Sequence, residues 1–250
     1  MKKVDICLVI FSLILSINLV TASMLIPADQ KAKDNSQAPE HSPVIGENWD
    51  LERIDFIHYV KPQEAKAQGQ KTETCYKLMG VKWTSFPVSY IINPTNQQGL
   101  SQDFISSAIS NSAETWDYAT SKELFNTYTI NYTAQYGIQD FKNTIVFGDY
   151  SDSNVIAVTS VWYTRIGKRI IEFDQLYNTD FIWGDVFFNT TVMDLQNIAT
   201  HELGHAVGLG DIYNQVCNSV TMYGYSGYGE TSKRTLEKPD ITGLQKLYGL

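Results

Sequence analysis

The segment His201–Asp211 constrains this chain more than any other part of it. It reads His-Glu-Leu-Gly-His-Ala-Val-Gly-Leu-Gly-Asp. On a helix, residues i and i+4 lie one turn apart on the same face, so His201 and His205 can hold one metal ion. Glu202 lies beside the first of them and can reach a water molecule at the metal. Gly208 lets the chain leave the helix through a left-handed residue, which brings Asp211 in as a third ligand.

This ligand set predicts a catalytic zinc ion rather than a structural one. Three protein ligands leave a fourth position for water, whereas structural zinc is closed by four protein ligands. No histidine follows His205, so Asp211 is the natural third ligand. Two simpler alternatives remain: His201 and His205 are hydrogen-bonded histidines of an ordinary core helix, or Asp211 only caps that helix and water completes the site.

The pattern resembles the metzincin metallopeptidases, with Asp211 at the position where most members carry a third histidine. Met222, within Ser219–Gly224, resembles the methionine of the turn beneath their metal, and Asp240–Gly249 is similar to the closing helix of matrixins. The resemblance implies an α+β, metzincin-like catalytic domain over residues 75–250, built from a twisted mixed five-stranded sheet with three helices. It also implies one catalytic Zn²⁺.

The resemblance further implies a zinc-dependent endopeptidase in which Glu202 is the general base. Tyr223 and Tyr225 flank Met222 and are candidates for stabilising an oxyanion or for lining the substrate pocket. A protein or peptide substrate is expected to add as an extra strand to an exposed sheet edge. The matrixin resemblance places that edge at Ile156, Ala157, Val158 and Thr159. The alternative is that these four residues belong to an ordinary interior strand.

Two other functions compete with proteolysis. The chain could be a non-catalytic, secreted zinc-binding or adhesion protein, or a zinc amidase that acts on cell-wall substrates. Glu202 argues against the first of these, because binding zinc requires no base.

The N-terminus has the features of a secretory signal peptide. Lys2 and Lys3 precede the apolar run Ile6–Val20, and small residues lead to Ser23. Residues 1–22 are therefore predicted to be removed, and the protein is expected to be secreted or extracellular, with a cell-surface location as a variant. The apolar run is short for a membrane span, so no stable membrane anchor is expected.

Residues 23–74 are predicted to be a prosegment or an N-terminal extension. They contain an apolar stretch from Trp49 to Val60 between two polar stretches. This stretch either covers the cleft before activation, which would make the protein a zymogen, or is simply an extension docked on the domain.

Cys75 and Cys217 remain once the signal peptide is removed. In an oxidising compartment, two cysteines most simply form one disulfide. The alternative is that Cys75 is a latency switch on the zinc, as in matrixin prosegments. However, Thr74-Cys75-Tyr76 lacks the Pro-Arg-Cys-Gly surroundings of that switch.

The net charge of −8 disfavours nucleic acid and anionic membranes as partners. We expect a protein or peptide substrate and a monomer. Asp149, Asp152 and Asp174 are candidate Ca²⁺ ligands, although an acidic surface loop is the favoured interpretation of these residues. The structural zinc of matrixins is not expected, because the remaining histidines, His41 and His58, lie in the N-terminal extension.

Hydrophobic periodicity and turn residues predict the elements of the domain. Ser101 is expected to cap a helix that runs to about Ala119. Gly167 is expected to turn the last two strands into a hairpin, and Thr191 with Asp194 to start the active-site helix as a capping box. Pro239 fits the first turn of the last helix, whose Ile241, Leu244 and Leu247 face inward. The predicted strands are Val88–Ile92, Tyr128–Tyr132, Thr144–Phe147, Val155–Tyr163 and Arg169–Phe173.

Overall fold

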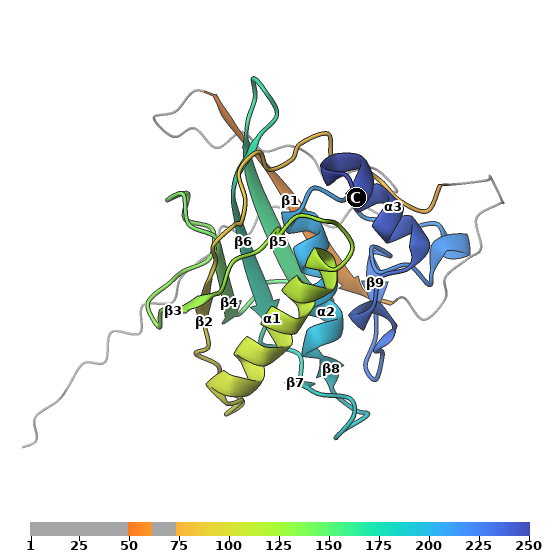
Figure 1. Ribbon diagram of the computed structural model, residues 1–250. Helices are drawn as coiled ribbons and strands as arrows, with labels where there is room; N and C mark the ends of the chain where they lie inside the picture. Colours follow the sequence, from red (N-terminus) through yellow and green to blue (C-terminus); the bar gives the residue numbers. More distant parts are fainter. Residues whose placement is uncertain (1–49, 62–73) are drawn as a thin grey trace, which may run out of the picture. The chain divides into compact units, whose positions relative to one another are not determined.

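The computed structural model describes residues 50–61 and 74–250 (Figure 1). The predicted signal peptide and most of the predicted extension lie outside these residues. The helices are α1 (Gln102–Asp117), α2 (Leu195–Ala206) and α3 (Lys238–Tyr248). The strands are β1 (Leu51–Val60), β2 (Ile91–Asn93), β3 (Thr129–Ile130), β4 (Thr144–Gly148), β5 (Val155–Thr164), β6 (Ile170–Asn178), β7 (Trp183–Gly184), β8 (Met193–Asp194) and β9 (Tyr225–Ser226).

The main sheet has the strand order β3-β2-β4-β6-β5-β1-β9. Strands β3, β2, β4 and β6 pair in parallel, and β5 runs antiparallel to β6. Helices α1 and α2 pack side by side along the sheet (Figure 1). The α+β class with a mixed sheet and three helices is confirmed. The predicted count of five strands is wrong for the described residues, because β1 and β9 extend the sheet beyond β5 to seven strands.

Helix α1 begins where the sequence predicts and holds α2 in place. The Ser101 hydroxyl accepts a hydrogen bond from the Phe104 amide at 3.2 Å, which caps the helix. Trp116 is fully buried, and its indole N–H donates to the Thr200 carbonyl at 2.8 Å. Ser112 donates to the Gln196 carbonyl at 3.1 Å. These bonds join the C-terminal half of α1 to the first part of α2, before His201.

The start of α2 differs from the prediction. Its N-cap is Asp194, whose carboxylate accepts the Asn197 amide at 2.9 Å, whereas Thr191 donates its hydroxyl to Asn189 instead. Arg234 donates to the Asp194 carboxylate from the other side. A carboxylate accepts these bonds and also interacts favourably with the positive end of the helix dipole. Asp194 therefore takes the N-cap position that was predicted for Thr191.

The strands occur in the predicted order but with different bounds. Strand β6 continues beyond Phe173 to Asn178, because residues 174–178 pair with all five residues of β4. Strands β2 and β3 are shorter than predicted, and Val88 forms only an isolated bridge with Phe125. The β5–β6 hairpin turns at Gly167, which has a φ of +84°. The turn is therefore the one that the glycine predicts.

Cys75 and Cys217 form the predicted disulfide. The bond joins the start of the domain to the short 3-10 helix Gln215–Cys217, which lies between Asp211 and Met222. Closing a loop of this length restricts the unfolded chain by about 5 kcal/mol in the chain-entropy model. Because the Cys75 sulfur is committed to this bond, the structure contradicts its alternative role as a thiol switch.

In the part of the chain that the structure describes, every helix is too short or too polar to cross a bilayer.

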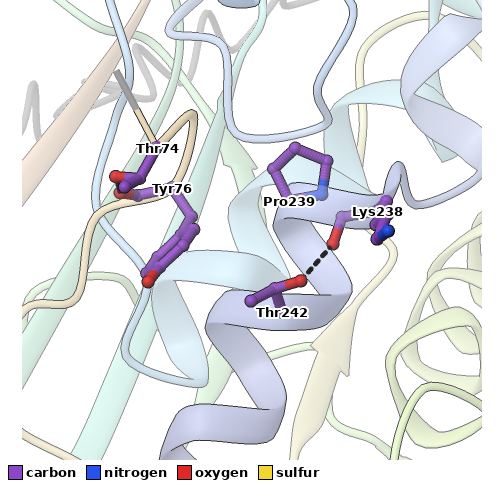
Figure 2. Close-up of a pocket in the computed structure, with 5 residues that line it drawn as sticks. All are labelled: Thr74, Tyr76, Lys238, Pro239 and Thr242. Carbon is purple, nitrogen blue, oxygen red and sulfur yellow. Dashed lines mark hydrogen bonds between the residues drawn. The ribbon is translucent and has the colours of Figure 1, made fainter. Parts of the chain in front are cut away.

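Figure 2 shows a pocket between the start of α3 and the segment that follows residue 73, where the Thr242 hydroxyl donates to the Lys238 carbonyl at 2.8 Å. It is lined by Thr74, Tyr76, Lys238, Pro239 and Thr242. None of these residues was predicted to act in a site.

Candidate metal centre

Helix α2 places His201 and His205 one turn apart, with their Nε2 atoms 3.1 Å from each other. The Oδ1 atom of Asp211 lies 3.2 Å from Nε2 of His201 and 3.5 Å from Nε2 of His205. All three side chains are buried. The structure thus brings together the three residues that the sequence predicts as metal ligands.

The other nitrogen of each imidazole is held by the backbone. Nδ1 of His201 donates to the Thr221 carbonyl at 2.7 Å, and Nδ1 of His205 donates to the Leu209 carbonyl at 2.8 Å. A neutral imidazole that donates from Nδ1 presents a lone pair at Nε2. Burial lowers the pKa of His201 to about 4, which favours this neutral form.

The three atoms fit a zinc ion. Two ligand atoms on a tetrahedral zinc with bonds of about 2.1 Å lie about 3.4 Å apart, which matches the observed spacing. Oδ1 of Asp211 is buried without a hydrogen-bond donor. A buried carboxylate oxygen that lacks a donor and faces two imidazole lone pairs is what a bound cation would satisfy.

The loop that delivers Asp211 depends on Gly208. This residue has a φ of +95°, and a Cβ atom there would lie 2.6 Å from the Val81 carbonyl oxygen. Only glycine adopts this conformation freely, as the sequence predicts. The amides of Thr221 and Met222 donate to the carboxylate of Asp240 on α3 at 2.9 and 3.2 Å. Helix α3 therefore holds the turn that contains Met222 against α2.

Glu202 lies beside the cluster, and each oxygen of its carboxylate accepts a hydrogen bond. The Thr159 hydroxyl of β5 donates to Oε2 at 2.5 Å, and Nδ1 of His58 is 2.9 Å from Oε1. Burial raises the pKa of Glu202, whereas the neighbouring His201 and His205 act in the opposite direction. A carboxyl group with a raised pKa beside a metal centre is suited to accept and release a proton.

His58 is the residue of this site that sequence reasoning missed. Its Nε2 atom is 3.0 Å from the hydroxyl of Ser226, and its ring is buried. Burial lowers the pKa of His58 to about 3, so the ring is neutral. The one signal in the sequence was the alternation of Ile54, Phe56 and His58, which is typical of a half-buried strand. That pattern does not say where the strand binds.

The predicted substrate edge is not exposed. Strand β5, which carries Ile156–Thr159, pairs with β6 on one side and with β1 on the other. All four residues are buried. The prediction of a free edge is therefore wrong in this structure, because β1 pairs with β5 along that edge.

The two candidate tyrosines pack in a small hydrophobic cluster that follows Asp211 in the chain. Tyr223 is buried in a small cluster with Ile212, Cys217 and Val220, and its ring centroid lies 5.8 Å from that of Tyr225 on β9. Tyr213 is a second residue that the sequence did not single out: its ring lies 5.3 Å from that of Tyr225. Burial, followed by the charge of Asp211, raises the pKa of its phenol.

The candidate calcium ligands do not gather in the described residues. Asp174 is buried on β6 and accepts the amides of Gly137 and Thr144 at 2.7 and 3.1 Å. Asp152 accepts the amide of Asn154 at 2.9 Å, and Asp149 is exposed. The metal-capable groups of three found among the described residues both involve His201, one with His205 and Asp211 and one with His58 and Glu202.

A twisted mixed sheet, an active-site helix with two histidines and a methionine turn beneath them define a metzincin-like fold. The family model described as Matrixin matches residues 82–249, and the chain belongs to this family. It is 45% identical over 60 residues to Metalloendoproteinase 5-MMP of Arabidopsis thaliana, 48% over 52 residues to Matrilysin of Rattus norvegicus and 34% over 84 residues to Matrix metalloproteinase-25 of Homo sapiens. These matches cover 24%, 21% and 33% of this chain, and 16%, 18% and 15% of the respective relatives.

Proposed function

We propose that this protein is a zinc-dependent endopeptidase. The observation that carries the proposal is the meeting of His201, His205 and Asp211 at the spacing of zinc ligands, with the Glu202 carboxylate beside them, in a domain of the matrixin family. The names of the relatives, which include a metalloendoproteinase and a matrix metalloproteinase, support the same reaction.

In this proposal the three residues hold zinc, which supplies Lewis-acid activation of water and of the scissile carbonyl. Glu202 accepts a proton from the attacking water and transfers it to the leaving amine. The hydroxyl of Thr159 orients the carboxylate through Oε2. A substrate strand would be positioned by the backbone of β5, as extended peptides are on sheet edges. Met222 supports the ligand helix from below, and Tyr223 and Tyr225 form one wall.

Secretion belongs to the same proposal. It is supported by the basic start, the apolar run and the small residues within 1–22, and by the disulfide, a bond typical of oxidising compartments. Residues 23–74 would then be a prosegment and the chain a zymogen. A monomer remains our expectation.

The test is cleavage of a quenched peptide library by the chain, with and without limited proteolysis, beside a Glu202→Ala variant. We expect cleavage that requires zinc, is blocked by a chelator and falls by about 10²–10⁴-fold in the variant, the range typical of a general base. Zinc content measured on the same samples shows whether the variant still binds metal. A protein that binds zinc but cleaves no peptide would favour the binding-protein alternative. Cleavage of cell-wall polymers but not of peptides would favour the amidase.

A further inference from the structure

The loop between β7 and β8 exposes two adjacent aromatic side chains. Phe187 and Phe188 are 84% and 83% exposed, and their rings meet edge to face with centroids 5.1 Å apart. Large aromatic side chains usually bury their apolar surface, so an exposed adjacent pair marks a surface that contacts another group. The proposed peptidase mechanism uses neither ring. The next residue in the chain, Asn189, begins the tripeptide Asn-Thr-Thr.

The sequence contains three Asn-x-Thr tripeptides, which begin at Asn93, Asn131 and Asn189. An asparagine in this pattern is an acceptor for N-linked glycans when the middle residue is not proline. The middle residue is proline in the first tripeptide, tyrosine in the second and threonine in the third. The pattern therefore leaves Asn131 and Asn189 as acceptors.

The two remaining asparagines have the same local geometry. Oδ1 of Asn131 accepts hydrogen bonds from the Thr133 amide at 2.9 Å and from its hydroxyl at 2.8 Å. Oδ1 of Asn189 accepts the corresponding bonds from Thr191 at 3.0 and 2.8 Å. Both asparagines are exposed. The threonine hydroxyl of each tripeptide thus already contacts the amide group that a transferase would modify.

The amide nitrogens distinguish these two asparagines from the third. Nδ2 of Asn93 donates to the carbonyls of Tyr132 and Ala134 at 3.2 and 2.9 Å, which fixes that amide against the neighbouring turn. Nδ2 of Asn131 and of Asn189 donates to no atom of the residues that the structure describes. Both of these nitrogens therefore face solvent, with room for a bulky group.

The turn that presents Asn189 is anchored to the domain. The amides of Phe188 and Asn189 donate to the Asp185 carbonyl at 3.0 and 3.1 Å, and the Asp185 carboxylate accepts a bond from Arg234 at 2.6 Å. These bonds hold the asparagine and the aromatic pair in one fixed turn. A sugar on Nδ2 begins one residue from Phe188, so its first ring is within reach of the exposed aromatic surface.

We infer that Asn131 and Asn189 carry N-linked glycans, and that the first sugars of the Asn189 glycan lie over Phe187 and Phe188. In the transfer, Nδ2 forms a bond to C1 of the first sugar of an oligosaccharide linked to a polyisoprenoid phosphate. The bond between C1 and the phosphate oxygen breaks, the lipid phosphate leaves with the electron pair, and Nδ2 gives one proton to solvent. The apolar C–H face of a sugar ring can then pack on an aromatic face while its hydroxyls stay in water.

This inference rests on the secretion that forms part of the proposed function, because the lipid-linked donor is used during export. The full chain is therefore produced in a eukaryotic secretory cell with its own residues 1–22 and, in parallel, with the signal peptide of the host in their place. Export under the host signal alone, with sugar at both sites, would contradict the predicted signal peptide and support the glycan sites. Export with both sites bare would overturn the glycan sites and leave secretion intact.

Peptide mass spectrometry of the exported protein measures the occupied fraction of each asparagine. We expect sugar on Asn131 and Asn189 and none on Asn93, which is the internal control. Thr191→Ala is expected to abolish occupancy of Asn189 and leave Asn131 occupied, whereas Thr191→Ser, which keeps the hydroxyl, retains sugar on Asn189. Sugar on Asn189 in the alanine variant would contradict the role of the hydroxyl.

A second measurement tests whether the Asn189 glycan covers the aromatic pair. The Thr133→Ala chain, which keeps the Asn189 glycan alone, is purified with that glycan and, from cells in which synthesis of the lipid-linked donor is inhibited, without it. We expect the glycan to raise the Tm by about 2–4 °C, the shift that one added aromatic contact gives in a domain of this size. Chymotrypsin, which cuts after exposed aromatic residues, is expected to cleave after Phe187 and Phe188 more slowly when the glycan is present.

Replacing both Phe187 and Phe188 by Ser in the same background separates contact with the rings from general effects of a glycan. We expect the glycan to leave the Tm of this variant unchanged. An equal rise in Tm with and without the rings would show that the sugar does not pack on them. Equal Tm values and equal cleavage rates for the two forms of the Thr133→Ala chain would likewise overturn the cover, even if Asn189 is occupied.

Discussion

Met222 lies directly against Gly204, in the turn of α2 between the two histidines of the metal cluster. A Cβ atom at position 204 would collide with the Met222 sulfur and lie 2.7 Å from the Trp116 ring. The absence of a side chain at residue 204 therefore lets the methionine turn and α1 approach the helix that carries His201 and His205. The glycine within the His-Glu-Leu-Gly-His segment has a packing role that complements the ligand spacing.

Substituting Gly204 by Ala tests this packing. We expect the free energy of unfolding to fall by about 1–3 kcal/mol, the usual cost of overpacking a filled core. Urea denaturation of the metal-loaded protein measures the change. Gly227→Ala is the matched control, since nothing lies within 4 Å of a Cβ atom there. Equal stabilities of the two variants would contradict the close approach.

Asp211 is predicted to be required for metal binding. Changing it to Ala removes the carboxylate oxygen that faces both imidazoles. We expect the dissociation constant for zinc to rise by at least about 100-fold, since even the loss of an outer partner of a ligand costs 10–100-fold. Competition with a chromophoric chelator gives the constant, and Asp149→Ala, at an exposed carboxylate, serves as the control. An unchanged affinity would favour the interpretation of Asp211 as a cap of α2 alone.

The disulfide is expected to contribute strongly to stability. Replacing both Cys75 and Cys217 by Ser should lower the free energy of unfolding by about 2–5 kcal/mol, because the bond closes most of the domain into one loop. Urea denaturation with and without a reducing agent measures it. Reductant should lower the stability of the parent to that of the double variant and leave the variant unchanged. A parent that is insensitive to complete reduction would refute the prediction.

Asp174 should make the protein less stable as the pH rises. Burial raises its pKa to about 8 in the folded chain. Between its ordinary pKa near 4 and this value, the folded state binds more protons than the unfolded state, so stability falls with increasing pH. The slope from this residue is at most about 1.4 kcal/mol per pH unit. Above pH 8 its contribution to the slope ends.

Asp174→Asn removes that titration. We expect a flatter dependence of the free energy of unfolding on pH between 5 and 8, measured by urea denaturation at several pH values. The variant also loses an acceptor for the amide of Gly137 or Thr144, so it should be less stable at low pH. The slope is therefore the decisive quantity. Asp149→Asn, at an exposed position, should keep the parental slope, and an equal slope in Asp174→Asn would contradict the raised pKa.

Local spacing in the sequence determined the candidate metal centre. His201 and His205 are one helical turn apart, and Gly208 ends the helix at a left-handed residue, so the positions of both rings follow from helix geometry. Asp211 follows three residues after that turn. The pairing of Cys75 with Cys217 followed from their being the two cysteines left after the predicted signal peptide. Both inferences could be made from the sequence because the metal ligands lie within eleven residues and because two cysteines in an oxidising compartment tend to form a disulfide.

The cover of that centre was decided only by the tertiary structure. The alternation of Ile54, Phe56 and His58 predicts a strand with one buried face, and the sequence left open whether this stretch covers the cleft. Strand pairing is non-local: many sheet edges offer the same main-chain donors and acceptors, so the partner depends on which edge the folded domain leaves open. Here that edge is β5, which brings His58 to Glu202 across 144 positions of the chain. Helix periodicity thus defines the metal ligands from sequence, whereas contacts between distant strands, which no local spacing encodes, determine what lies over them.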